Sequence, residues 1–244
     1  MTAERALFLS IVIPAFNEEG RLAATLREVL GYLRTTAWEW EVRVVDDGSS
    51  DGTAEVVSSF HRDEPRVMVQ AEPHRGKGGA VKAGLLAARG DYRFICDADL
   101  SMPIAEIARF LPPRVIDVDV AIGTREGGGA RRIGEPLRRH LVGRVFNGLV
   151  KLLLLPGIND TQCGFKMFTA RAVADIFPHV TVHGWTFDIE ALYIARQHGL
   201  RLVEVPIDWH YRERSQVKML RDGLAMFADL LRIRRRAKRG AYVG

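Results

Sequence analysis

Cysteines and long apolar runs are scarce in this sequence. With only Cys96 and Cys163 among 244 residues, the chain has neither a disulfide framework nor a CxxC metal site. The best apolar run, 149–155, is short and contains Lys151, whereas a membrane-spanning helix needs about 20 residues. Residues 1–6 lack the apolar core and cleavage site of a signal peptide. We therefore expect a cytoplasmic protein, bound peripherally to the cytoplasmic face of a membrane if it meets one.

Internal repeats and low-complexity linkers are also missing. With 47% hydrophobic and 27% charged residues, the chain has enough apolar side chains for a buried core and is not compositionally disordered. Its length suits one large α/β domain.

Positive charge is concentrated in two segments. The net charge is +5, but 212–239 alone carries +7 and 125–151 carries +5, so the rest of the chain is acidic. Such basic segments suit an anionic surface, either phospholipid or nucleic acid. The alternative is that they are solvated helix faces.

The first half alternates apolar strands with helical patterns. This rhythm predicts a parallel sheet covered on both faces, and ligands of such sheets bind at the carboxyl ends of the strands. Polar clusters follow the expected strand ends at Asn17-Glu18, Asp46-Asp47, Asp97–Asp99 and Thr124-Arg125. The expected strands are 7–13, 41–45, 67–70, 92–96 and 118–122, and helices are expected over 18–33 and 77–89.

The second half contains two amphipathic helical patterns. The first, over 137–154, has an apolar stripe, and the second begins near 215 and ends in a basic run. Both suit either core-packing helices with solvated outer faces or an interfacial surface on anionic lipid. The stripe consists of Leu137, Leu141, Val145, Leu149 and Leu152.

Asp97-Ala98-Asp99 directly follows an expected buried strand. Two carboxylates so spaced can hold one divalent cation and leave room for phosphate oxygens, as Mg²⁺ prefers. A surface turn is the alternative, since aspartate is common in turns.

Pro14-Ala15-Phe16-Asn17-Glu18 and the run Val45–Thr53, reading V-D-D-G-S-S-D-G-T, complete a recognisable set with that D-A-D. The combination resembles the family 2 glycosyltransferases over nearly the whole chain. The resemblance implies a single GT-A domain of α/β class, with a mostly parallel central sheet. It also implies Mg²⁺ or Mn²⁺ on Asp97 and Asp99. The nucleotide sugar would contact Pro14, Ala15, Phe16, Glu18, Asp46, Asp47, Lys77, Asp97, Ala98, Arg125, Arg212 and Lys218.

Within the family, the likeness is to enzymes that load a sugar onto polyprenyl phosphate. Arg75–Val81 looks like their R-G-K-G-x-A-V segment, and Asp160–Lys166 like their D-x-x-x-G-F-K segment. Gly184–Glu190 is similar to the W-x-F-D-x-E of dolichyl-phosphate β-glucosyltransferases, and Val205-Pro206-Ile207 matches a V-P-I segment. Ser101 departs from the mannosyl pattern D-A-D-L-Q, which leaves the third metal ligand open.

The resemblance implies inverting transfer from UDP-glucose to polyprenyl phosphate, giving the β-linked lipid product and UDP. It implies Asp99, Arg125 and Asp188 as catalytic residues and Arg131, Arg132 and Lys166 as contacts of the acceptor phosphate. Alternative readings are a GDP-mannose donor, a hydroxyl acceptor with Asp188 or Asp160 as base, and an inactive nucleotide-sugar binder. A nucleic-acid-binding module is a further alternative, disfavoured because it needs neither the D-A-D nor the two turns.

The expected domain arrangement follows from the same resemblance. Residues 1–211 would form the GT-A domain, with a nucleotide-sugar-binding half over 1–125 and an acceptor half over 126–211. Residues 212–244 would form a basic helical segment. The expected partners are the nucleotide sugar, polyprenyl phosphate and an anionic membrane surface, with no nucleic acid.

Overall fold

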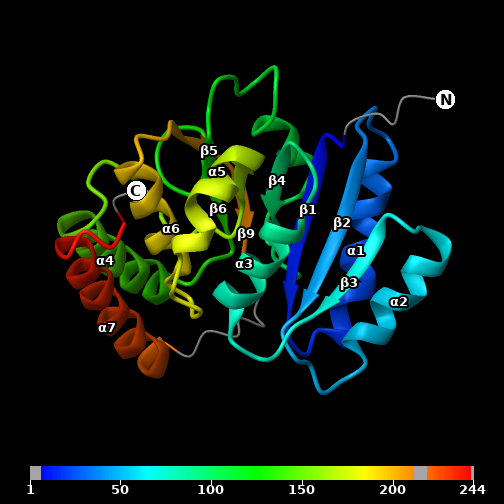
Figure 1. Cartoon of the computed structure of the whole chain (residues 1–244), viewed down its shortest axis with the longest axis horizontal. Coiled ribbons are helices and arrows are strands. Elements are labelled where there is room, and N and C mark those ends of the chain that lie inside the picture. The colour runs from blue at the N-terminus through cyan, green and yellow to red at the C-terminus, as the bar shows by residue number, and fades with distance from the viewer. Residues whose placement is uncertain (1–6, 212–218, 243–244) are drawn as a thin grey trace.

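A central mixed sheet organises the described residues, 7–211 and 219–242, of this computed structural model (Figure 1). Its seven strands run in the order β3-β2-β1-β4-β7-β5-β8, and all are parallel except β7, which is antiparallel to β4 and β5. The strands are β1 Leu9–Ala15, β2 Trp40–Asp46, β3 Val67–Ala71, β4 Tyr92–Ile95, β5 Val120–Thr124, β7 Lys166–Thr169 and β8 Leu202–Pro206.

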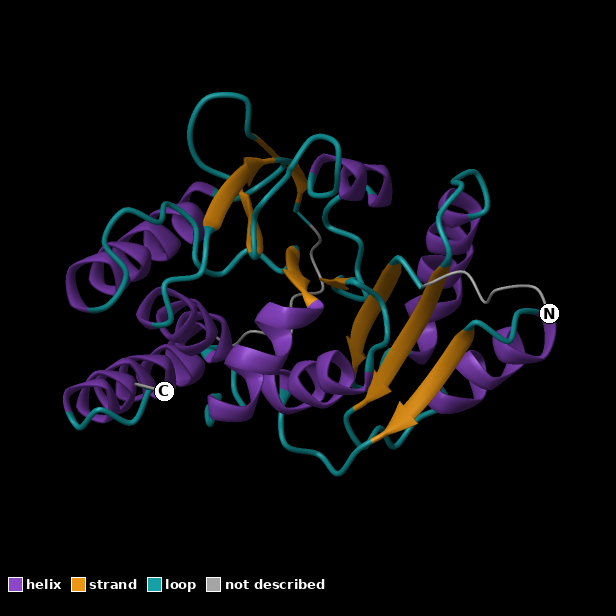
Figure 2. Cartoon of the chain, turned by 45° about the horizontal axis from the view of Figure 1, so that its top comes forward, coloured by secondary structure: helices purple, strands orange, loops and turns teal. Residues whose placement is uncertain are grey.

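Helices cover both faces of this sheet (Figure 2). One face carries α1 Glu19–Leu33, α2 Thr53–Asp63 and the 3-10 helix η1 Ile104–Arg109. The other carries α3 Lys77–Ala87, α4 Leu137–Leu153, α5 Ala170–Ile176, α6 Phe187–Gln197, α7 Met219–Lys238 and the short 3-10 helix η2 Phe177–His179. The α/β class and the mostly parallel sheet expected from the sequence are confirmed.

The two-faced core explains the continuous apolar strands. In β1, Ile11 and Ile13 pack among the helices of one face while Val12 packs on the other, because successive side chains point to opposite sides. All three are fully buried. The five strands expected from the sequence match β1 to β5 to within a few residues, and β7 and β8 are additional.

Two short strands, β6 Arg131–Ile133 and β9 Asp208–His210, pair in parallel beside the main sheet. Their pairing brings the basic segment after β5 against the segment after β8. Both segments therefore lie near the carboxyl ends of the parallel strands.

Helices α4 and α7 lie side by side at the edge of the molecule (Figure 1). The expected stripe of α4 lies on its outer side: Leu141 is 66% exposed and Leu152 80% exposed. Helix α7 belongs partly to the core, since Leu230 and Ile233 are fully buried. Among the described residues, no helix combines the length and apolarity needed to cross a bilayer.

The expected domain boundary between 211 and 212 stays a prediction. Arg212 and Lys218, assigned by the resemblance to donor phosphate, lie outside the described residues.

Candidate active site

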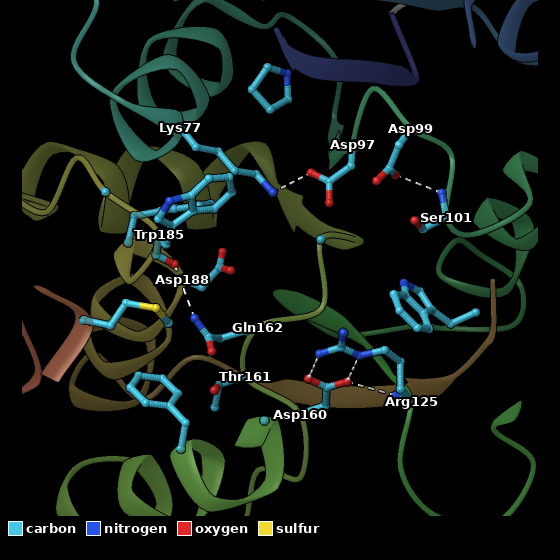
Figure 3. A pocket seen from close by; sticks show the side chains of 18 of the residues that line it. Lys77, Asp97, Asp99, Ser101, Arg125, Asp160, Thr161, Gln162, Trp185 and Asp188 are labelled. Atoms are coloured by element: carbon cyan, nitrogen blue, oxygen red, sulfur yellow. Dashed lines mark hydrogen bonds and ion pairs between the residues drawn. The ribbon is translucent and has the colours of Figure 1, made fainter. Parts of the chain in front are cut away.

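A cavity of about 550 Å³ opens at the carboxyl ends of the parallel strands (Figure 3). It collects the loops after β1, β2, β4 and β5 together with residues of α4, α6 and α7. Among the residues expected from the sequence, it is lined by Pro14, Ala15, Phe16, Glu18, Asp47, Lys77, Asp97, Ala98, Asp99, Arg125, Arg132 and Asp188.

Asp47 and Asp46 shape the turn that follows β2. The Asp47 carboxylate is 3% exposed and accepts hydrogen bonds from the backbone N–H groups of Arg75 and Gly76, both at 2.9 Å. Asp46 does not line the cavity; its carboxylate accepts from the Ser49 N–H at 3.0 Å and holds the turn closed. Asp46 therefore stabilises the loop that Asp47 presents to the cavity.

An aromatic platform lies beside this turn, formed by Phe16, which the sequence predicted as a donor contact, and His74, which it did not. Phe16 stacks on His74 with ring centroids 4.2 Å apart, and both line the cavity. His74 Nδ1 lies 2.9 Å from Asp47. A flat aromatic surface beside a carboxylate suits a nucleobase, which has a π face and polar edges. No motif signals His74, because only the fold brings it to Phe16.

Asp97 and Asp99 point into the cavity from the loop after β4 (Figure 3). Lys77, at the first residue of α3, places Nζ 2.5 Å from Asp97 Oδ1. Burial alone would lower the pKa of Lys77, but the carboxylates of Asp97, Asp188 and Asp99 together more than offset this and raise it. Asp99 Oδ1 accepts from the Ser101 N–H at 3.0 Å. Lys77 therefore stays charged beside the carboxylate pair.

The carboxylate pair fits a divalent cation held jointly with a ligand. Among the described residues, no three His, Cys, Asp or Glu side chains cluster to enclose a metal. Asp97 and Asp99 offer oxygen donors on one loop, and Mg²⁺ commonly takes one or two carboxylates and completes its shell with phosphate and water. Ser101, next to the pair, also lines the cavity. The donor set therefore fits a metal bound together with a diphosphate.

Behind this pair lies a buried ion pair between Lys166 and Asp188. Lys166 is 1% exposed, lies 3.2 Å from Asp188 and does not line the cavity. Its Nζ also donates to the Cys163 carbonyl at 2.5 Å. Burial raises the pKa of Asp188, and Lys166 and Lys77 oppose this. Lys166 therefore forms a buried ion pair that holds the Asp188 carboxylate, and of the two residues only Asp188 lines the cavity.

Arg125 and Asp160 form a bidentate pair across the cavity from Lys77 (Figure 3). Arg125 Nε and Nη2 lie 2.6 and 2.8 Å from the carboxylate oxygens, and its backbone N–H donates to Oδ2 at 3.0 Å. The guanidinium also lies 5.3 Å from the Trp209 ring centroid. Burial alone would raise the pKa of Asp160, but Arg125 lowers it to about 2. The pair fixes the guanidinium plane where an anion can meet it.

Asp160→Asn is expected to remove stability that depends on pH. The pKa of the Asp160 carboxyl is about 2 in the folded chain, against 3.8 for an unperturbed aspartate in the unfolded chain. The stabilisation by the ion pair is therefore present above about pH 4 and is lost as the pH falls towards 2. That shift corresponds to about 2 kcal/mol of unfolding free energy. Urea titrations should show a gap between wild type and variant that is widest near neutral pH and narrows below pH 4. A gap independent of pH would contradict the assignment.

The basic residues expected to meet the acceptor are placed differently from one another. Arg132 lines the cavity and pairs with Glu126 at 2.8 Å and Glu135 at 2.6 Å. Arg131 pairs with Asp208 outside the cavity, and its side chain is 72% exposed. The alternation along β6 explains the difference, because neighbouring residues of a strand point to opposite sides. Arg144, which the sequence analysis did not assign, also lines the cavity.

Comparison with known proteins agrees with the motifs. The family model described as glycosyl transferase family 2 matches residues 10–177. The chain is 36% identical to a curated dolichyl-phosphate β-glucosyltransferase of Homo sapiens, over 96% of this chain and 77% of the relative. It is 31% identical to the protein of that name from Saccharomyces cerevisiae, over 98% of this chain and 78% of the relative.

Solved structures share the fold at lower identity. Mannosyl-3-phosphoglycerate synthase from Rubrobacter xylanophilus gives a TM-score of 0.69 at 21% identity, over 96% of this chain and 75% of that chain. Glucosyl-3-phosphoglycerate synthase from Mycobacterium tuberculosis, in complex with Mn²⁺, UDP and glucosyl-3-phosphoglycerate, gives 0.66 at 18% identity, over 93% of this chain and 79% of that chain.

Proposed function

The chain belongs to glycosyl transferase family 2 and is a glycosyltransferase, and on that premise we propose that it transfers glucose from UDP-glucose to polyprenyl phosphate with inversion at the anomeric carbon. The observation that carries the proposal is one cavity that combines an aromatic-and-carboxylate platform, a carboxylate pair with a lysine, and guanidinium groups opposite them. The curated relatives, named for glucosyl transfer to dolichyl phosphate, support the choice of sugar and acceptor.

The donor would lie along the side formed by the loops after β1, β2 and β4. The base stacks on Phe16 and meets Asp47, which places the diphosphate towards Lys77, Asp97 and Asp99. The assigned contacts Arg212 and Lys218 stay predictions. Lys77, which pairs with Asp97 in the free protein, would also contact the donor diphosphate when the nucleotide sugar binds. The same ammonium group would then neutralise carboxylate charge before binding and phosphate charge after it.

A bound Mg²⁺ or Mn²⁺ would neutralise charge on the departing diphosphate, and Asp97 and Asp99 are the residues that would hold it. The assignment comes from the donor chemistry of the pair, and the Mn²⁺ and UDP-glucose in a structure of the same fold agree with it. Asp188 would act together with Asp97 to keep Lys77 charged, which is the role we assign to this predicted catalytic residue.

A phosphate acceptor explains why no strong general base is required. The second pKa of a phosphate monoester is about 6, so the nucleophile is largely dianionic at neutral pH. What it needs is cations that hold it beside an equally negative donor. Arg132 and the fixed guanidinium of Arg125 meet this need inside the cavity. In-line attack converts an α-linked nucleotide sugar into a β-linked lipid product.

Arg132→Gln is expected to raise KM for polyprenyl phosphate by about tenfold, the loss of one charge-assisted hydrogen bond. KM for UDP-glucose should stay unchanged, because Arg132 lies on the acceptor side. Arg131→Gln is the matched comparison, since the adjacent side chain points outside the cavity. Initial rates with each substrate varied in turn check this. An equal rise in KM for the Arg131 variant would show that the acceptor binds outside the cavity.

The lipid would reach this site from an anionic membrane surface to which the protein binds peripherally. The outer side of α4 exposes Leu137, Leu141, Val145 and Leu152, and Leu224 of the neighbouring α7 is 78% exposed. Together with Phe227, these residues form what we call the apolar rim. The exposed end of α7 adds basic residues that suit anionic headgroups. They are Arg234, Arg235 and Lys238, with Arg239 directly after the helix.

A double substitution, Leu141→Gln and Leu152→Gln, is expected to weaken association with anionic vesicles by about tenfold or more, since each exposed leucine loses apolar burial in lipid. The free energy of unfolding should change little, because both side chains are already in water. The control is Ile116→Gln. Ile116 is 66% exposed, like Leu141, but lies outside α4 and α7. Vesicle sedimentation measures the effect, and equal binding by all three proteins would remove the membrane assignment.

The acceptor class is tested by offering UDP-glucose with a short polyprenyl phosphate or with the matching free polyprenol. We expect transfer to the phosphate and none to the alcohol, with the anomeric coupling constant in the NMR spectrum showing the β product. Transfer to the alcohol would contradict the proposal and would make Asp188 the candidate base.

A further inference from the structure

The segment 180–186, here called the Trp185 loop, forms one wall of the cavity. Trp185 lines the cavity, and Lys77 Nζ lies 5.6 Å from its ring centroid. The loop is also pressed against the start of α3, since the His183 carbonyl accepts from the N–H of Gly78 at 2.7 Å. A Cβ at Gly78 would lie 2.8 Å from the Val182 carbonyl. The position of this loop therefore sets the position of the Lys77 side of the site.

Glu190 holds the beginning of this loop from the side away from the cavity. Its carboxylate is fully buried and receives four hydrogen bonds. Three come from the loop: the N–H and hydroxyl of Thr181 and the N–H of Val182, at 2.7 to 2.8 Å. The fourth comes from the Tyr242 hydroxyl at 2.5 Å. Glu190 thus ties the loop to a residue that follows α7.

Asp229 of α7 holds the other end of the loop. Its Oδ2 accepts from the Thr186 hydroxyl at 2.6 Å, and Thr186 is fully buried. Tyr242, 52 residues from Glu190 in the sequence, is 2% exposed and is fixed further by Arg236 and His198. Two residues of the C-terminal region, Asp229 and Tyr242, therefore anchor the loop, directly and through Glu190, and neither of them lines the cavity.

We propose that Asp229 and Tyr242 are positioning residues of the donor site: they brace the Trp185 loop and so hold Trp185 and Lys77 in place for the nucleotide sugar. Helix α7, which carries Asp229, also carries Leu224 and Phe227 of the apolar rim on its exposed side. This inference rests on the proposed function for the identity of the donor.

The test compares Tyr242→Phe and Thr186→Val with the wild-type chain. The first removes the hydroxyl that donates to Glu190 and accepts from Arg236, and the second removes the hydroxyl that donates to Asp229. Both substitutions keep the shape of the side chain. Amide hydrogen exchange of the peptide covering 180–186 should rise by about tenfold in both variants, because an anchor of the loop is lost. Calorimetric titration with UDP-glucose and Mn²⁺ should show affinity weakened about five- to tenfold, as expected for a lost hydrogen bond to a charged group.

Asp119→Asn is the matched control for a merely structural effect. Asp119 is a buried carboxylate, 7% exposed, that accepts from the Arg201 N–H at 2.8 Å at the opposite end of the sheet. This variant should lose thermal stability with no change in donor affinity. If amide hydrogen exchange of the Trp185 loop, or the affinity for UDP-glucose, is unchanged in both variants, the proposed positioning role is wrong. A wild-type chain that does not bind UDP-glucose would contradict the proposed donor, while the exchange result would still decide the brace.

Discussion

Asp99→Ala is expected to abolish glucosyl transfer while the chain stays folded. The loss should be at least about a thousandfold in kcat/KM, since a metal contributes several kcal/mol of charge stabilisation in the transition state. The structure shows why the fold should survive: Asp99 faces the cavity, and its carboxylate accepts a hydrogen bond from the nearby Ser101 N–H. Rates at saturating Mg²⁺ and Mn²⁺ and the thermal midpoint are the measurements.

Asp63→Ala gives the matched control for this substitution. Asp63 is an exposed aspartate at the end of α2, outside the cavity. Its variant should keep wild-type rates. If Asp99→Ala also keeps its rate to within about twofold, a margin too small for a lost metal ligand, the carboxylate pair is not the metal site.

Gly164→Ala is the second substitution with a large expected effect. A Cβ at this position would lie 1.9 Å from Asp97 Oδ2, so the carboxylate must move. Because the atom in the way is the end of a side chain, the free energy of unfolding should change little, whereas a ligand displaced by about 1 Å can cost on the order of 100-fold in rate. We expect a large loss of kcat with a nearly unchanged thermal midpoint.

Gly31→Ala separates this effect from glycine chemistry in general. A Cβ at Gly31 in α1 meets nothing within 4 Å. This variant should keep full activity and be slightly more stable, by about 0.4–1 kcal/mol, because alanine restricts the unfolded chain. A Gly164→Ala variant as active as the Gly31→Ala variant would mean that the position of Asp97 is not critical.

Features that depend on local sequence patterns could be predicted from the sequence. The five apolar runs match β1 to β5, and the motifs lead to most of the cavity wall, because parallel strands bring their carboxyl ends to one edge. The family and the α/β fold were predicted on the same basis and are confirmed.

Contacts between segments that are distant in the sequence could not be predicted. His74 stacks on Phe16 only because the fold brings the two together, and no sequence motif contains both residues. Lys166 carries a charge but lies beneath the cavity, because β7 enters the middle of the sheet and turns it inward against Asp188. The apolar stripe of α4 illustrates the same limit: periodicity predicted the helix, but only the structure shows that the stripe faces outwards.

The proposed transfer from UDP-glucose to polyprenyl phosphate is tested most directly by a donor screen scored on the lipid product. The chain is incubated with Mg²⁺ or Mn²⁺, a short polyprenyl phosphate and, separately, UDP-glucose, UDP-galactose, UDP-GlcNAc or GDP-mannose, and lipid-linked sugar is detected by mass. We expect a lipid-linked hexose from UDP-glucose alone. Transfer from GDP-mannose instead, or release of nucleotide with no lipid product, would contradict the proposal.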